Sequence, residues 1–398
     1  MLKKFTVLII LLLCNVLLSQ NSNIPIFAFH GVPPGDFSTK GQFDIMKKAG
    51  IDICYTVYNT SEEIVKALDA AQKSNVKLVV RTALIVNDTE KLVNLIKDHP
   101  ALYGYGIMDE PSPSKFDNLN KIIQNIRKYD KKNVFYINLF PNYVASNNID
   151  NYKYEDYLQT FINKVPVTFL SFDNYPLVNN KVRDDWYENL ELISRVGKKN
   201  NIPFWAFACT TIHYNYLKPT LAGIKLQQFS NLLYGARVLQ YFTYWTLTYE
   251  DNWIKEKYSY SIVDDKGKPT PTYDIVKTVN EQIQRLSWVF FRATSDAVFH
   301  TGNEIPLGTK RLTLPPKRFK YFSTNGRNAL VSFMTNKKNK FIIIQNKSLD
   351  EDLVLNYQLE KPVKVVENNS GRTKSITSTN KLKTTILPGD ILIFTYDN

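Results

Sequence analysis

Between Ile26 and Leu247 the sequence alternates repeatedly between a short apolar run and a longer amphipathic stretch. Short runs rich in β-branched and aromatic residues predict strands, and apolar residues three and four positions apart predict helices. Eight alternations in roughly 220 residues match a closed (β/α)8 barrel better than an open doubly wound sheet. The first run is followed by His30-Gly-Val-Pro-Pro-Gly35, which lacks the glycine fingerprint of a dinucleotide fold. We therefore predict an α/β fold, a TIM barrel.

The eight predicted strands are Ile26 to Phe29, Ile51 to Tyr58, Lys77 to Arg81, Tyr103 to Met108, Val134 to Leu139, Thr168 to Phe172, Pro203 to Ala208 and Val238 to Tyr244. Helices are predicted at Ser61 to Gln72, Thr89 to Lys97, Phe116 to Tyr129, Tyr154 to Asn163, Asp184 to Asn200 and Thr220 to Tyr234. A last helix, Tyr273 to Leu286, is expected to close the barrel.

After Trp288 the pattern changes to short strands separated by turn residues. These strands are Ala329 to Met334, Lys340 to Gln345, Asp352 to Tyr357, Val363 to Val366 and Asp390 to Thr395. Their spacing predicts a small antiparallel β-sandwich. We expect a signal peptide at 1–20, a barrel domain at 24–287 and a C-terminal β-sandwich domain at 288–398 that carries no catalytic group.

The N-terminus has the pattern of an export signal. Lys3 and Lys4 precede an apolar run from Phe5 to Leu18, which is too short to span a bilayer and is followed by polar residues. This pattern predicts removal of the signal and a mature protein in the periplasm, on the cell surface or outside the cell. Leu13 stands before Cys14 where a lipoprotein signal has a small residue, so lipid anchoring is not favoured but stays open. No later stretch is long and apolar enough for a membrane helix.

Composition limits the partners and cofactors. The formal net charge is +13, but the lysines are spread without a nucleic-acid motif, so we expect a solvated basic surface and no nucleic-acid partner. The charge is also compatible with an acidic or sulfated glycan as substrate. Cys54 and Cys209 lie in apolar runs far apart in strand order and are expected to be buried thiols. The four histidines are scattered, so we expect no metal or other cofactor.

The segment Tyr103-Gly-Tyr-Gly-Ile-Met-Asp-Glu-Pro-Ser112 ends a predicted strand in two adjacent carboxylates. Pro111 prevents the strand from continuing, so Asp109 and Glu110 stand at its C-terminal end. Barrel enzymes keep their catalytic groups at this end. An alternative interpretation is that one of the two residues caps the helix expected to begin near Ser114.

Other polar and aromatic residues follow the remaining strands and are expected to lie on the same face. They are His30, Tyr58, Asn59, Arg81, Asn138, Asp173, Asn174, Tyr175, Thr210, Thr211 and Trp245. Carboxylates, amides and aromatic rings suit a polyhydroxylated ligand, because its hydroxyls need hydrogen bonds and its C–H faces stack on rings. We predict sugar binding by His30, Tyr58, Arg81, Asn138, Tyr175 and Trp245. For Arg81 and Asn138 a purely structural role remains an alternative, and we expect Trp205 in the core and His213 in an exposed loop.

On these residues the sequence resembles the barrel glycoside hydrolases of the (trans)glycosidase superfamily, from about residue 24 to 286. Glu110 matches the acid/base position of the clan A enzymes, and Trp245 matches their sugar-platform tryptophan. The likeness fails on strand seven, where Trp205-Ala-Phe-Ala-Cys-Thr-Thr211 has no carboxylate in place of the clan A nucleophile. Asp109 and Glu110 are similar to the pair of substrate-assisted N-acetylhexosaminidases, in which the Asp orients the substrate's acetamido group.

The second carboxylate therefore has more than one candidate. Asp173, in a Phe-Asp-Asn-Tyr element that resembles the Tyr-Asp of chitinase-like barrels, is preferred to Asp109, because adjacent strand side chains alternate in direction. Glu250 or Asp251 is a reserve candidate. Two carboxylates suffice for glycoside hydrolysis, and a retaining mechanism is weakly preferred.

The sequence thus predicts an exported glycoside hydrolase with Glu110 as general acid, its pKa raised by Asp109 and by partial burial. The alternatives are a non-catalytic glycan-binding protein on the same scaffold, indicated by the missing strand-seven Glu, and a lyase or other enzyme acting on polyanions.

Overall fold

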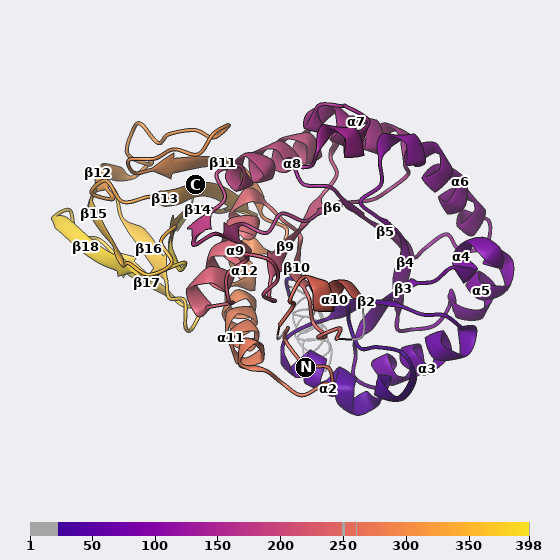
Figure 1. The fold of residues 1–398 in the computed structure, drawn as a ribbon. Coiled ribbons are helices and arrows are strands. Elements are labelled where there is room, and N and C mark those ends of the chain that lie inside the picture. The colour runs from indigo at the N-terminus through magenta and orange to yellow at the C-terminus, as the bar shows by residue number, and fades with distance from the viewer. Residues whose placement is uncertain (1–22, 249–250, 260, 398) are drawn as a thin grey trace, which may run out of the picture.

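The computed structural model describes residues 23–248, 251–259 and 261–397. In this part of the chain eight parallel strands close into a barrel, and helices form a ring around it (Figure 1). The strand order around the barrel is β1-β10-β9-β6-β5-β4-β3-β2, so strands consecutive along the barrel are also neighbours in space. The predicted TIM barrel is confirmed.

The barrel strands are β1 (Ile26–Phe29), β2 (Ile53–Val57), β3 (Lys77–Arg81), β4 (Leu102–Asp109), β5 (Val134–Leu139), β6 (Leu170–Phe172), β9 (Phe204–Cys209) and β10 (Val238–Phe242). The helices are α2 (Lys40–Lys48), α3 (Ser61–Gln72), α4 (Leu84–Asn87), α5 (Thr89–Ile96), α6 (Phe116–Arg127), α7 (Tyr154–Lys164), α8 (Trp186–Asn200), α9 (Leu221–Tyr234), α10 (Asp251–Lys255), α11 (Pro271–Arg285) and α12 (Ser287–Phe290). Short 3-10 turns, η1 (Gly35–Phe37), η2 (Pro113–Lys115) and η3 (Ser146–Ile149), and a hairpin, β7 (Leu177–Val178) and β8 (Lys181–Val182), lie in the loops.

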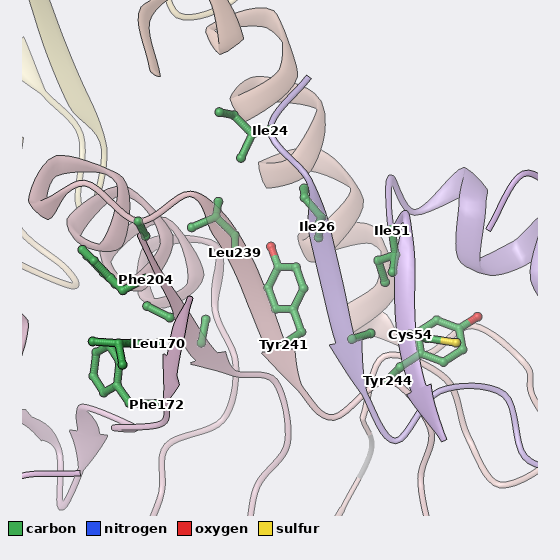
Figure 2. Close-up of a cluster of buried hydrophobic side chains, with 14 of the residues drawn as sticks. Ile24, Ile26, Ile51, Cys54, Leu170, Phe172, Phe204, Leu239, Tyr241 and Tyr244 are labelled. Atoms are coloured by element: carbon green, nitrogen blue, oxygen red, sulfur yellow. The ribbon is translucent and has the colours of Figure 1, made fainter. Parts of the chain in front are cut away.

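Both faces of the barrel strands are buried, because alternate side chains face the barrel interior and the helices. The interior is filled largely by aromatic rings, and Trp205 stacks on Phe169 with ring centroids 3.8 Å apart. Trp205 is therefore core, as expected. On the outer face, Ile26, Leu239 and Tyr241 project from β1 and β10 into the layer shared with the helices (Figure 2).

Glycines and a β-bulge shape strand β4. A Cβ atom on Gly104 would lie 2.3 Å from the Val134 carbonyl oxygen, so only glycine allows β4 to approach β5 this closely at that point. The register between the two strands shifts between Gly106 and Met108, which is the mark of a bulge. The bulge changes which side chains at the end of β4 face the barrel interior.

The C-terminal part forms two antiparallel sheets packed on a common apolar core, which confirms the predicted sandwich. The larger sheet consists of β11 (Thr294–Thr301), β13 (Ala329–Asn336), β14 (Asn339–Asn346), β19 (Ile391–Asp397), β16 (Val363–Val366) and β17 (Thr373–Ile376), and the smaller of β12 (Phe319–Ser323), β15 (Leu353–Leu359) and β18 (Lys381–Ile386). Strands β11, β12, β17 and β18 were not among the predicted elements, and neither was α2.

Helix α9 joins the two parts, because the larger sheet of the sandwich covers its outer side (Figure 1). Lys225 of α9 donates to Asp390 at 2.5 Å, and the side chains of this pair are only 11% and 10% exposed. Asp390 also accepts hydrogen bonds from Gln282 of α11, at 2.9 Å, and from Asn368, at 3.2 Å. One buried carboxylate thus ties two barrel helices to the sandwich.

Some expectations concern residues outside the described ranges. The signal peptide at 1–20, Cys14 and the reserve candidate Glu250 belong to these, and the export prediction stays a prediction. Within the described ranges no helix is long and apolar enough to cross a bilayer.

We predict that Asp390→Ala lowers the free energy of unfolding by about 3–5 kcal/mol, because it leaves the buried Lys225 ammonium without its anion. Chemical denaturation followed by circular dichroism measures this change. Asp98→Ala is the matched control, since Asp98 pairs with Lys132 at the surface and is 79% exposed. The control should cost less than about 1 kcal/mol. Equal losses in the two variants would contradict the proposed role of the buried pair.

Candidate active site

Three carboxylates meet at the C-terminal rim of the barrel. Asp109 is the last residue of β4, Glu110 follows it directly, and Asp173 directly follows β6. Strand β5 lies between β4 and β6, and its Asn138 is in register with Asp109 on one side and Ser171 on the other. Residues in register on neighbouring strands share a face of the sheet, so these side chains point toward the barrel axis.

The bulge in β4 decides the direction of Asp109. Gly106 is in register with Tyr136, whose ring is in the interior, while Met108 is in register with Ile137, which faces the helices. Asp109 consequently shares the inward side of Asn138. The expectation that Asp109 points away from the partner site of Glu110 is wrong, because the bulge before Asp109 turns it inward and the left-handed backbone of Glu110 ends the regular alternation after it.

Glu110 has a left-handed backbone conformation, with φ of +46°. Its N–H donates to the Asn138 carbonyl oxygen at 2.9 Å, which continues the β4–β5 pairing by one residue before Pro111 ends it. Neither carboxylate caps the following helix, since no side-chain cap is present on η2 or α6 and the Ser114 N–H bonds to Asp150. The capping interpretation is therefore wrong.

A buried polar network orients Asp173. The Asn138 amide donates to Asp173 Oδ1 at 2.7 Å, and the Asn138 amide oxygen accepts from the Ser171 hydroxyl at 3.0 Å. Gln240 donates to the same hydroxyl at 3.0 Å and accepts from the Tyr136 phenol at 2.8 Å. Because its oxygen is already engaged, Asn138 presents its N–H group to the carboxylate.

Burial and mutual repulsion shift the pKa values of the three acids. Burial, with the charges of Asp173 and Asp109, raises the pKa of Glu110 to about 9. Burial and the charge of Asp109 raise the pKa of Asp173 to about 7, against the opposing effects of Asn138 and Tyr175. Glu110 therefore keeps its proton at neutral pH.

The pKa of Asp109 is also raised by its surroundings, while Asn138 and the charge of Arg81 act in the opposite direction. The Asp109 side chain is exposed to solvent, and loss of hydration at the barrel mouth is the largest cause of its raised pKa. Arg81 donates to the Gly106 carbonyl at 3.2 Å and is in no ion pair with a described carboxylate. Its charge favours the ionised form of Asp109.

Aromatic rings line the opposite side of the rim. Phe242, at the end of β10, stacks on Tyr175 with centroids 5.1 Å apart, and the His30 ring meets its edge at 6.0 Å. The buried His213 ring lies between those of Tyr216 and Tyr258, with centroid distances of 4.4 and 4.5 Å. The prediction that His213 lies in an exposed loop is therefore wrong. Burial lowers the pKa of His30 to about 4, so its ring is neutral at physiological pH.

Two loop residues, Arg183 and Tyr143, pack together near Asp173. The Arg183 guanidinium lies 3.6 Å above the ring of Tyr143, and the charge of Asp173 contributes to a raised pKa of this phenol. Sequence reasoning missed Tyr143, Arg183 and Tyr216, because they belong to loops, where no periodicity indicates direction. The sequence does carry a signal for Phe242, because it lies two residues after Gln240 on the same strand and so faces the barrel interior as well.

Two predicted substrate-binding residues are not at the rim. Tyr58 and Trp245 are each 1% exposed and belong to the apolar layer between the barrel and the helices. Tyr58 has the outward parity of Cys54. Trp245 lies beyond the end of β10 at Phe242, where Tyr244 and Trp245 both belong to this outer layer. Their predicted contact with substrate is wrong.

The other predicted rim residues divide in the same way. Asn59 is exposed, and its backbone N–H donates to the Glu63 carboxylate in the first turn of α3. The Thr210 and Thr211 hydroxyls are buried and donate to backbone carbonyls. Asn174 donates to Asn189 and supports the loop. His30, Arg81, Asn138 and Tyr175 stay at the rim with the three carboxylates.

Strand seven of the barrel, β9, ends at Cys209 on its inward side. The thiol donates to the Thr211 carbonyl at 3.2 Å, and burial raises its pKa to about 12. This strand thus offers no ionised group. Among the described residues no three His, Cys, Asp or Glu side chains are grouped so that they could hold a metal ion.

No protein-family model and no curated protein sequence matches the chain. A GH42 β-galactosidase from G. stearothermophilus superposes with a TM-score of 0.58 and 9% identity, over 95% of this chain and 99% of that one. A GH5_18 protein from Bifidobacterium longum subsp. longum, solved with Manb1-4GlcNAc, superposes with a TM-score of 0.50 and 9% identity. This match covers 65% of this chain and 78% of that one. The match to a β-galactosidase from Marinomonas ef1, at 0.48 and 9%, covers 66% of this chain and only 60% of that enzyme. The resemblance to glycoside hydrolase barrels is confirmed at the level of the fold.

We predict that Glu110→Gln raises the melting temperature at pH 9 more than at pH 5. The folded pKa of this carboxyl is above its unfolded value, so its stabilising contribution is complete below the unfolded pKa, near 4.5, and disappears as pH rises through about 9. Glutamine stays neutral throughout, so its advantage grows with pH. Differential scanning calorimetry measures the difference, with Glu155→Gln at the exposed Arg195 pair as control. A difference in melting temperature between Glu110→Gln and the unmodified protein that does not depend on pH would contradict the raised pKa.

Proposed function

We propose that this protein is an exported glycoside hydrolase, with Glu110 as the general acid. The observation that supports the proposal is the combination of a protonated Glu110 with two further carboxylates on the same rim. Glycoside cleavage requires one carboxyl that gives a proton to the leaving oxygen and another that stays ionised. Burial and the repulsion between the three acids favour this division of roles without any contribution from strand seven.

Asp173 is the proposed second catalytic carboxylate. The amide of Asn138 holds its Oδ1 at 2.7 Å, which fixes the direction of the remaining oxygen. Asp109, whose ionised form the charge of Arg81 favours, contributes to the raised pKa of both neighbours. Phe242 and His30, which are partly exposed on the aromatic side of the rim, provide surfaces against which a sugar ring can pack.

The second candidate function is glycan binding without catalysis. Cys209 favours it, because a neutral thiol stands where clan A enzymes carry their nucleophile. Both functions use the same rim, so they differ in turnover and not in binding.

We predict that Glu110→Gln lowers kcat/KM on an oligosaccharide by on the order of 10²–10⁴-fold, because glutamine has no proton to give. The loss on a 4-nitrophenyl glycoside should be much smaller, since this leaving group departs without protonation. Steady-state kinetics on both substrates, with Glu155→Gln as control, test the assignment. Wild-type activity in Glu110→Gln would refute the acid role, and binding without turnover by the unmodified protein would favour the second function.

A second kinetic prediction separates Asp173 from Asp109. If Asp173 is the nucleophile or base, aryl glycosides with a plain 2-hydroxyl are cleaved and Asp173→Asn is inactive on them. If Asp109 orients a 2-acetamido group, only N-acetylated sugars react, because the substrate supplies the nucleophile. Matched aryl glycosides that differ only at C2 are assayed with wild type, Asp109→Asn and Asp173→Asn. We expect the first pattern, and turnover confined to the acetamido substrate with active Asp173→Asn would contradict it.

A further inference from the structure

A cavity of about 880 Å³ lies between the barrel and the sandwich. Strand β8, the residues after it and the start of α8 form its barrel side, and residues 303–307, 325–328, 346–348 and 351–352 form its sandwich side. Because β7 and β8 follow β6, this cavity is on the same end of the barrel as Asp173. Its volume is within the range of ligand-binding pockets.

The charged residues that line the cavity are sorted by depth. The four carboxylates, Asp184, Glu304, Glu351 and Asp352, are all exposed, as are Lys181 and Arg327. Lys181 pairs with Asp184 at 3.0 Å, and Arg327 pairs with Glu351. The only partly buried charged side chains of the lining are Arg183 and Lys347. Arg183 is paired with Asp185 at 3.4 Å, so Lys347 is the one partly buried cation of the described lining without a salt bridge.

Lys347 forms no salt bridge with a described carboxylate; burial lowers its pKa to about 8, and the more distant charge of Glu304 acts in the opposite direction. Its ammonium lies 3.2 Å from Nδ1 of His300 and 4.6 Å from the centre of the Tyr187 ring. His300 is fully buried and its Nε2 faces the Tyr234 hydroxyl at 3.1 Å, and burial together with Lys347 lowers its pKa so that it stays neutral. A partly buried ammonium without an anion is costly, and an anionic ligand would remove this cost.

Arg183 connects the cavity with the active site. Its guanidinium lines the cavity and also covers the Tyr143 ring, whose phenol is close enough to Asp173 to respond to its charge. Asparagine side chains, among them Asn303, Asn328 and Asn346, provide further donors and acceptors along the lining. Arg183 thus belongs to the cavity lining and also packs on a ring beside the catalytic rim.

We propose that this cavity is a subsite for a negatively charged sugar, a residue that carries a carboxylate or a sulfate, with Lys347 and Arg183 as its charge partners. The inference rests on the proposed function and makes it more specific, since it assigns an acidic polysaccharide as the substrate class. Asn and aromatic side chains bind the neutral parts of the sugar, and the two cations select its charge.

Isothermal titration calorimetry on the full chain tests the subsite, with Glu110→Gln present throughout to prevent cleavage. The probes are trigalacturonate and its methyl ester for the carboxylate, and a κ-carrageenan tetrasaccharide and its desulfated form for the sulfate. At least one charged probe should bind about tenfold tighter than its uncharged partner, and Lys347→Met should remove this preference. Arg183→Gln, on a separate element, should weaken the same probe, and Lys364→Met, on the exposed face of β16, should leave it unchanged.

A preference for the carboxylate, the sulfate or both supports the subsite and identifies its anion. Equal affinity for charged and uncharged probes, or an undiminished preference in folded Lys347→Met, would overturn it. Turnover by the unmodified protein is measured separately by release of reducing ends. Charge-selective binding without turnover rejects the proposed hydrolase and retains the subsite, whereas turnover with charge-indifferent binding rejects the subsite alone.

Discussion

Because the eight strands are parallel and close on themselves, every strand has to end at the same rim, and polar residues from distant parts of the sequence meet there. In this protein three of those residues are carboxylic acids on β4 and β6 or directly after them. Burial at the rim and the repulsion among the three acids raise the pKa of Glu110 above neutrality. The proton on Glu110 is thus a consequence of barrel closure, and the chemistry that we propose depends on it.

The fold could be predicted well from the sequence because its signals are local and repeated. Each barrel strand is a short apolar run between amphipathic helices, and the burial of both strand faces explains why these runs are nearly continuous. The sandwich was predicted less completely. Strands such as β17 (Thr373–Ile376) and β18 (Lys381–Ile386) are short, polar on one face and rich in Lys and Thr, so their composition does not distinguish them from loops.

The candidate site was predicted only in part, and the errors have a common cause. Position along a strand can be read from sequence, but side-chain direction at its end depends on where pairing stops and on bulges. Asp109 turns inward because of the bulge before it, and Tyr58 turns outward by simple parity with Cys54. Trp245 lies beyond the end of β10, where strand alternation no longer applies. Tyr143 and Arg183 carry no such signal at all, because they meet only through the path of two long loops.

The enclosure of α9 has a consequence for the history of this chain. From Leu226 to Tyr234 every residue of the helix is buried, since the barrel lies on one side and the sandwich on the other. A barrel inherited without its sandwich would present this helix as an apolar surface in water, prone to self-association. Exchange of the sandwich for another module would require simultaneous changes along α9, so recombination at this junction is disfavoured and the two parts are expected to evolve as one unit.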